Sequence, residues 1–276
     1  MRVTCVVDDA AYPGSRFRCE HGVAFLIETA TKRLLFDTGQ SGSVLLHNLA
    51  LLDVRTDSIE AVAISHGHYD HTGGLEKLVE HLRPGTPLYA NPDLFRERFR
   101  EADGKLKSVG IALSRQALAA STPLRLHAEP KQIVAGMWTT GEITHRPDAE
   151  GRSDTHRMRQ GDAVAVDHYR DDMALVLEAD GRSMLLCGCC HAGLLNTLAH
   201  ANRFLGRPIQ VVAGGLHLLN ASEEELSHVC AALKAEPSLQ RVYPNHCTGK
   251  DAVVALTTAL GPSVVDPFPA GAALEL

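Results

Sequence analysis

The stretch ISHGHYDHTGG, residues 64–74, places three histidines and one aspartate within six residues. An apolar run precedes it and two glycines end it, which is typical of a loop that leaves a buried strand and enters a helix. Loops of this kind are anchored at both ends, and open α/β sheets place their ligands there. The stretch therefore predicts a ligand-binding loop at the end of a strand.

The spacing of the four side chains indicates their arrangement. In extended backbone, residues two apart point the same way, so His66, His68 and Asp70 can converge on one side. His71 breaks that period and needs a turn, which the glycine pair permits. Imidazole and carboxylate suit zinc, with manganese and iron as alternatives. Four adjacent ligands fit one tetrahedral ion badly, so we expect two divalent metal ions, one on the first two histidines and one on Asp70 and His71. The alternative is a polar loop that is merely rich in histidine.

Predicted strands and helices alternate along the chain. Strands close enough to form hairpins lie at 23–29 with 33–39 and at 173–179 with 183–188, and further strands lie at 60–65, 209–215 and 241–246. Helices are predicted at 75–82, 222–235 and 249–260. These elements form two α/β halves, about 1–90 and 165–276, with no Pro/Gly/Ser-rich linker. We expect a single domain, 1–276, with a less regular, lid-like segment at about 91–164 that includes a helix near 91–101.

Composition restricts the function. The net charge is −6 and no basic stripe is present, which disfavours nucleic acid as a partner. No apolar run reaches the roughly 20 residues of a membrane helix, so we expect no membrane partner. The apolar run at the N-terminus is interrupted by Asp8 and Asp9, so it is too short for the apolar region of a signal peptide. Seven cysteines, an odd number, suit a reducing compartment, and the expected location is cytoplasmic. The oligomeric state is not predicted.

The sequence resembles the metallo-β-lactamase superfamily. His66-Gly-His68-Tyr-Asp70-His71 matches its H-x-H-x-D-H motif, and residues 35–39, LFDTG, resemble its first motif. The resemblance implies an αββα four-layer sandwich with a dinuclear metal site at one edge. Histidine at position 68, where the flavodiiron reductases of the superfamily typically have glutamate, favours a hydrolase-type site.

Three blocks in the second half narrow the resemblance. CGCCHAGLLN (187–196), GGLHL (214–218) and YPNHCTGK (243–250) are similar to a subgroup that includes the archaeal dihydropterin–aminobenzene ribofuranosyl phosphate synthase of methanopterin biosynthesis. Cys190 stands where that subgroup usually has serine, and Leu216 where it has phenylalanine. These departures spare the expected ligands and leave the substrate undetermined.

The resemblance also implies the remaining ligands. His191 is expected to complete the first metal's set, and His246 the second. Most members have a bridging aspartate where this chain has Cys189, so Cys189 is either a thiolate ligand or a buried thiol that packs under the site. Asp37 is either a turn residue or the acceptor that orients the ligand loop from behind.

Other candidate residues concern the substrate. His217 is expected to line the pocket. Thr248 and Lys250 begin a helix directly after His246, so its free N–H groups and the lysine are expected to hold an anionic small molecule. His145, His156 and His168 are expected to face solvent, and His21 carries no signal.

The expected activity follows from the metals. We expect a dinuclear metal-dependent hydrolase in which a metal-bound hydroxide, oriented by Asp70 as the catalytic residue, attacks a small ester, lactone, lactam or phosphodiester. One alternative is a synthase that joins a pterin to an aminobenzene ribofuranosyl phosphate at the same site. Another is a metal-binding protein without catalysis. A covalent acyl-enzyme is not expected, because no G-x-S-x-G elbow is present.

Overall fold

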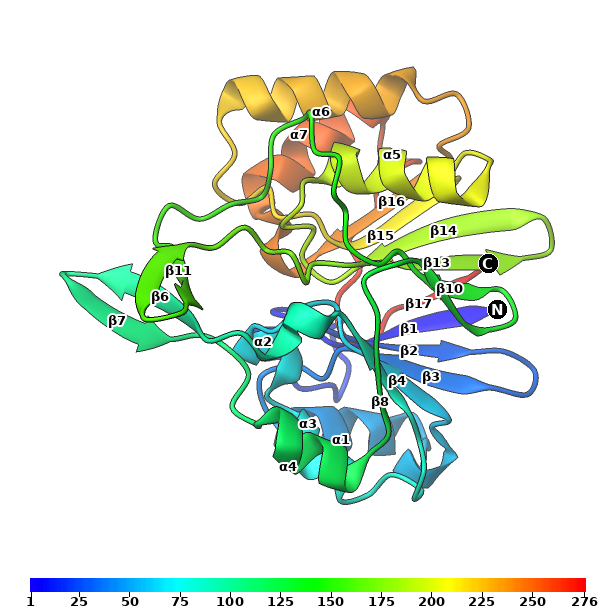
Figure 1. The fold of residues 1–276 in the computed structure, drawn as a ribbon. Helices are drawn as coiled ribbons and strands as arrows, with labels where there is room; N and C mark the ends of the chain where they lie inside the picture. Colours follow the sequence, from blue (N-terminus) through cyan, green and yellow to red (C-terminus); the bar gives the residue numbers. More distant parts are fainter.

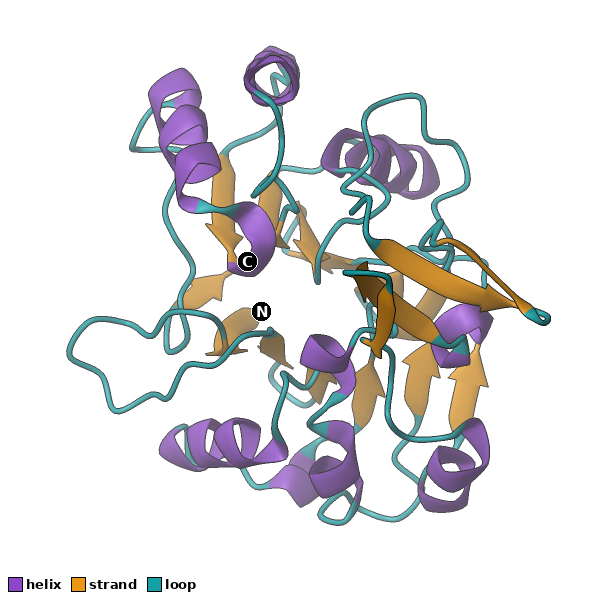
Figure 2. Ribbon diagram, turned by 90° about the vertical axis from the view of Figure 1, so that its left-hand side faces the viewer, coloured by secondary structure: helices purple, strands orange, loops and turns teal.

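The computed structural model describes residues 1–276 as two β-sheets packed face to face, with helices on both outer sides (Figures 1 and 2). The first sheet has the order β17 (Ala273–Glu275), β1 (Arg2–Val7), β2 (Ala24–Glu28), β3 (Arg33–Phe36), β4 (Ala61–Ala63), β5 (Leu88–Ala90) and β8 (Leu124–Leu126). The second has the order β16 (Arg241–Asn245), β15 (Val211–Gly215), β14 (Arg182–Cys187), β13 (Leu175–Ala179), β10 (Met137–Thr139) and β9 (Lys131–Val134).

Helices form the outer layers. Those beside the first sheet are α1 (Gly42–Leu51), α3 (Leu75–Val79) and α4 (Arg115–Ser121), and those beside the second are α5 (Leu194–Leu205), α6 (Glu223–Ala235) and α7 (Lys250–Leu260) (Figure 1). The short α2 (Tyr69–Thr72) and three 3₁₀ turns, Thr56–Ser58, Pro92–Phe95 and His246–Thr248, complete the set. No helix is both long and apolar enough to cross a membrane.

Three apolar clusters correspond to the three interfaces of this sandwich. The central cluster joins the inner faces of both sheets, with Phe25 and Phe36 from the first and Leu177 and Leu186 from the second. The two outer clusters pack each sheet against its own helices. Because the halves bury apolar surface against each other, neither has a complete core by itself. The predicted α/β fold, an αββα four-layer sandwich, is confirmed.

The middle segment is more regular than predicted. Its strands β6 (Arg98–Ala102), β7 (Lys105–Ser108), β11 (His156–Gln160) and β12 (Ala163–Val166) form a four-stranded antiparallel sheet, here called the arm. The arm projects from the sandwich on the side where α2 lies (Figure 1). The prediction of a helix near 91–101 is wrong. Only the 3₁₀ turn at Pro92–Phe95 forms, because residues from 98 onward pair with both β7 and β11.

The other predicted elements are present with slightly shorter bounds. The two predicted hairpins are antiparallel pairs, β2 with β3 and β13 with β14. The capping box predicted for α6 forms, since Ser222 Oγ accepts from the Glu225 N–H and the Glu225 carboxylate accepts from the Ser222 N–H.

Candidate metal centre

The predicted ligands lie where parallel strands end together. β3 and β4 run parallel in the first sheet, and β14, β15 and β16 run parallel in the second. The loop after β4 carries the H-x-H-x-D-H motif, and the loops after β14 and β16 carry His191 and His246. Because the carboxyl ends of parallel strands share one edge, residues more than 100 positions apart meet there.

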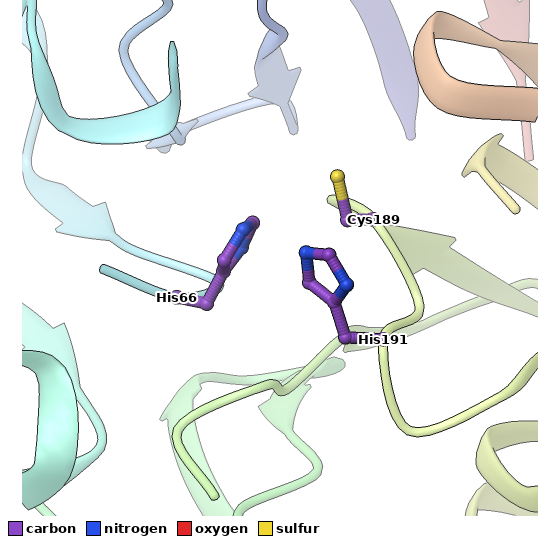
Figure 3. Close-up of side chains that lie close together, drawn as sticks. All are labelled: His66, Cys189 and His191. Carbon is purple, nitrogen blue, oxygen red and sulfur yellow. The ribbon is translucent and has the colours of Figure 1, made fainter. Parts of the chain in front are cut away.

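The first ligand group consists of His66, His68 and His191, as the sequence predicted. His66 Nε2 lies 3.0 Å from His68 Nδ1, and the ring of His191 lies 4.8 and 5.0 Å from those of His66 and His68. The buried Nε2 of His191 has no hydrogen-bond partner. Figure 3 shows His66 and His191 next to the thiol of Cys189, and the ligand atoms of these three residues lie within 4.8 Å of one another.

The second ligand group consists of Asp70, His71 and His246. Asp70 Oδ2 lies 3.5 Å from His71 Nε2 and 3.4 Å from His246 Nε2. Only 9% of the Asp70 side chain and 1% of the His246 side chain are exposed, so water screens these contacts weakly. The structure thus brings together both trios that the sequence assigned to separate ions. Their action as ligands stays a prediction.

Cys189 lies between the two groups. Its Sγ is 3.2 Å from His71 Nε2, and it belongs to one cluster with His66 and His191 and to another with His71 and His246. Burial, followed by the neighbouring Cys247 thiol, raises the pKa of Cys189 well above its usual value. Cys189 would therefore be a thiol without a cation and a thiolate ligand with one. Cys187 and Cys190 instead belong to the apolar core between the second sheet and its helices.

Hydrogen bonds on the far side orient the imidazoles. His71 Nδ1 donates to Asp37 Oδ2 at 2.7 Å, and His191 Nδ1 donates to the Gly151 carbonyl at 2.8 Å. His66 Nδ1 lies 2.9 Å from Ser65 Oγ, which itself donates to Asp37. Because these partners are acceptors, the protons sit on Nδ1 and the lone pairs of Nε2 face the groups. Asp37 therefore lies where the predicted orienting acceptor should be.

The protonation states suit cation binding. Burial lowers the pKa values of His66, His68 and His191 well below the ordinary range, so these imidazoles are neutral at pH 7. Burial pushes the pKa of Asp70 up, but the surrounding histidines outweigh it and hold that pKa well below its usual range. The pKa of His246 is raised, because Cys247, Asp70 and Asp9 outweigh its burial. The lowered pKa of Asp70 and the raised pKa of His246 both mean that the second group favours an added positive charge, which a divalent ion would supply in place of a proton.

Two adjacent aspartates hold the ligand loops of both halves. Asp171 Oδ2 accepts from the Gly67 N–H at 2.7 Å, between two predicted ligands, and Asp172 Oδ2 accepts from the Ala192 N–H at 2.8 Å, next to His191. The other carboxylate oxygen of Asp171 forms a 2.6 Å ion pair with the buried Arg98 of the arm. This pair was not predicted, although two carboxylates directly before a buried strand could have indicated it.

The structure adds residues to the site that the sequence analysis did not assign. Asp9 accepts from His246 Nδ1 at 3.1 Å and from His21 Nδ1 at 3.0 Å, and His21 Nε2 lies 3.4 Å from Asp70 Oδ2. The buried Tyr169 stacks on His191 with ring centroids 4.1 Å apart and an interplanar angle of 6°. No local pattern marks Tyr169 or His21, whereas Asp9, directly after the first strand, could have been considered as a site residue.

The prediction that His156 faces solvent is wrong. His156 is half-buried on β11, its Nδ1 lies 2.9 Å from the Tyr169 hydroxyl, and its ring lies 5.0 Å from that of His68. The polar sequence around it misled the prediction, because the arm folds its polar face over the ligands. His145 and His168 are exposed as expected.

A cavity of about 780 Å³ opens over both ligand groups. Its walls come from both halves and from the arm. Residues in contact with it include His68, Asp70, Cys189, His191, His217 and His246, with Arg100, Lys107 and His156 from the arm. His217 therefore lies in the predicted pocket, with its ring 4.2 Å from that of His191, and burial lowers the pKa of His217 to about 4.

The two predicted anion-binding residues do not reach this cavity. The Thr248 side chain is buried, accepts from the Leu216 N–H and donates to the Asn245 carbonyl, so it ties two loops together. Lys250 is exposed and is not part of the cavity wall. His246 begins a 3₁₀ turn that ends at Thr248, and Gly249, whose φ is 82°, follows before α7 starts. The helix start is therefore separated from the ligands. The assignment of substrate binding to Thr248 and Lys250 has no support in this geometry.

Comparison with known proteins identifies the family. Residues 18–191 match the family described as "Metallo-beta-lactamase superfamily". The chain belongs to the metallo-β-lactamase superfamily. The resemblance to this superfamily, and to its subgroup with the archaeal synthase, is confirmed.

Similarity to individual members covers nearly the whole chain. The 7,8-dihydropterin-6-methyl-4-(beta-D-ribofuranosyl)-aminobenzene-5'-phosphate synthase of Methanocaldococcus jannaschii is 27% identical over 260 residues, 90% of this chain and 88% of that protein. The crystal structure of Tm1679, a metal-dependent hydrolase of the β-lactamase superfamily, has a TM-score of 0.84 at 26% identity and covers 100% of this chain and 99% of that one. Zn²⁺-bound PqqB from Methylobacterium extorquens shares the fold, with a TM-score of 0.59 at 14% identity and coverage of 100% of both chains.

Proposed function

We propose that this superfamily member is a dinuclear metal-dependent hydrolase acting on a small ester, lactone, lactam or phosphodiester. The observation that carries the proposal is that two groups of predicted ligands, His66 with His191 and His71 with His246, meet on either side of Cys189 next to one cavity, whose wall also includes His68 and Asp70. The unpartnered Nε2 of His191 and the outward hydrogen bonds of the imidazoles fit bound divalent ions. We propose zinc, with Cys189 as a ligand shared by both positions.

Two such ions would supply Lewis acidity and an activated water. The protein's own contribution begins with Asp70, whose low pKa keeps it an ionised acceptor at neutral pH. Its Oδ2 can hold the proton of an attacking O–H group and so direct the oxygen toward the substrate. Asp9 and Asp37 fix the imidazoles behind it, which limits reorganisation during the reaction.

The second candidate is a synthase that joins a dihydropterin to an aminobenzene ribofuranosyl phosphate. The similarity to the archaeal synthase favours it, because that similarity spans 90% of this chain rather than the metal motif alone. A cavity of about 780 Å³ also falls in the range that holds organic molecules of this size. The same chain groups would then position two organic partners.

One set of experiments separates these proposals. Elemental analysis of protein purified without chelator should give about two transition-metal ions per chain. The metal-loaded protein is then assayed against esters, lactones, β-lactams and phosphodiesters, and separately with a dihydropterin donor plus the aminobenzene ribofuranosyl phosphate, with the joined product detected by mass spectrometry. Turnover of the first panel supports the hydrolase, and a joined product supports the synthase. Bound metal with neither activity would indicate a metal-binding protein without catalysis.

A further inference from the structure

The arm presents a row of three nitrogen-bearing side chains to the cavity. In the register of the arm, Arg100 on β6 lies directly opposite Lys107 on β7 and directly opposite His156 on β11. Directly opposed residues of antiparallel strands project on the same face of a sheet. All three side chains also line the cavity that contains the ligand groups, so this face is the one turned toward the metal centre.

The two cations of this row are not neutralised. The arm's other arginines have carboxylate partners, namely Asp167 and Asp171 for Arg98, Glu101 for Arg157 and Glu97 for Arg159. Arg100 and Lys107 form no ion pair within 4.0 Å. The carboxylates of the cavity wall, Asp9 and Asp70, are already engaged by imidazoles. The row therefore offers positive charge to a ligand rather than to the protein.

Hydrogen bonds and an ion pair fix the arm relative to the ligand loop, so the row is held at a defined position beside the ligands. The Tyr69 N–H, inside the H-x-H-x-D-H loop, donates to the Val109 carbonyl at 3.0 Å, directly after β7. At the base of β6, the buried Arg98 is bound to Asp171, which holds the Gly67 N–H of the same loop. His156 is anchored in turn by the hydroxyl of Tyr169, whose ring stacks on His191.

We infer that this row binds the terminal phosphate of a phosphomonoester substrate whose reacting bond lies at the two ligand groups, an inference that rests on the proposed function. A guanidinium and an ammonium side by side match a phosphate dianion in charge and in hydrogen-bond geometry. Neighbouring strands lie about 4.8 Å apart, so Arg100 and Lys107 are roughly 5 and 10 Å from His156 across the sheet. His156 is the end of the row next to the ligand groups, with its ring 5.0 Å from that of His68, so the phosphate lies beyond it on Arg100 and Lys107. With a net charge of −6, the attraction is local.

The test uses ribose 5-phosphate as the charged probe and ribose as its neutral counterpart. Binding of each to zinc-loaded protein is measured by calorimetry for the wild type, for the double variant Arg100→Gln/Lys107→Gln and for Lys105→Gln. Lys105 is the matched control, because it lies on the same strand but nearer the hairpin turn and outside the cavity wall. Zinc content and turnover of the ester and phosphodiester panel are measured on the same samples.

The wild type should bind ribose 5-phosphate more tightly than ribose, and the double variant should weaken ribose 5-phosphate roughly tenfold to hundredfold. Binding of ribose, zinc content and the behaviour of Lys105→Gln should be unchanged. An unchanged affinity of the double variant, an equal loss in Lys105→Gln, or no preference of the wild type for the phosphate overturns the inference. Unchanged affinity would place the phosphate on the metal ions. Failure of the proposed function is read separately, as missing zinc or missing turnover.

Discussion

Replacing Arg98 by methionine tests how the arm supports the metal centre. Arg98 is 1% exposed, and its guanidinium pairs with Asp171 at 2.6 Å and with Asp167 at 2.9 Å. Its Nη1 also donates to main-chain carbonyls of the turn that precedes β6. Methionine preserves much of the volume and removes the charge, so two buried carboxylates lose their counterion.

The expected loss is large. Removing one partner of a buried ion pair costs about 3–5 kcal/mol, because the remaining charge stays buried without compensation. Burial already raises the pKa of Asp171 to about 7, so this carboxyl can take up a proton, which favours the lower end of the range. A loss of that size corresponds to a fall in Tm of roughly 6–20 °C for a chain of this length.

The assay is urea unfolding of zinc-loaded protein, followed by circular dichroism, with zinc content measured in parallel. Arg157→Gln is the control, because Arg157 pairs with Glu101 on the exposed part of the same arm and should contribute no more than about 1 kcal/mol. Arg98→Met should also bind zinc less well, because Asp171 holds Gly67 between two predicted ligands. If Arg98→Met and Arg157→Gln lose the same small amount and keep their zinc, the buried network does not support the centre.

Three further predictions concern single residues. Cobalt-loaded protein should show a thiolate-to-cobalt absorption band that Cys189→Ala abolishes, and survival of the band in that variant would mean that Cys189 only packs beneath the site. Gly151→Ala should lower zinc affinity roughly tenfold to hundredfold, because a Cβ there would lie 2.7 Å from the Cβ of His217 and displace the carbonyl that orients His191, whereas normal zinc binding would show that the loop adapts. His127, whose Nε2 lies 2.7 Å from Thr139 Oγ1, has its pKa lowered by burial, so the folded state binds fewer protons than the unfolded state and stability falls as the pH drops below about 6.5. Urea curves of the wild type and His127→Gln at several pH values should diverge in that range, and parallel curves would contradict the assignment.

The sequence by itself determined the family and the ligand loop. The order of ligands in residues 66–71 follows from spacing along an extended segment, and such a local pattern does not depend on the rest of the fold. The buried strands and the helix with the Ser222 capping box were also predictable, because apolar periodicity and capping are properties of short segments.

Tertiary structure decided what surrounds that loop. Tyr169, His156 and His21 reach the site only because the arm and the N-terminal loop fold over it, and no local pattern marks them. The segment after Asn91 was predicted as a helix but pairs as strands, since pairing with partners distant in sequence outweighs local propensity. The positive charge of the cavity likewise lies on Arg100 and Lys107 rather than on Lys250, because cross-strand register, unlike sequence proximity to a ligand, sets which face of the arm points inward.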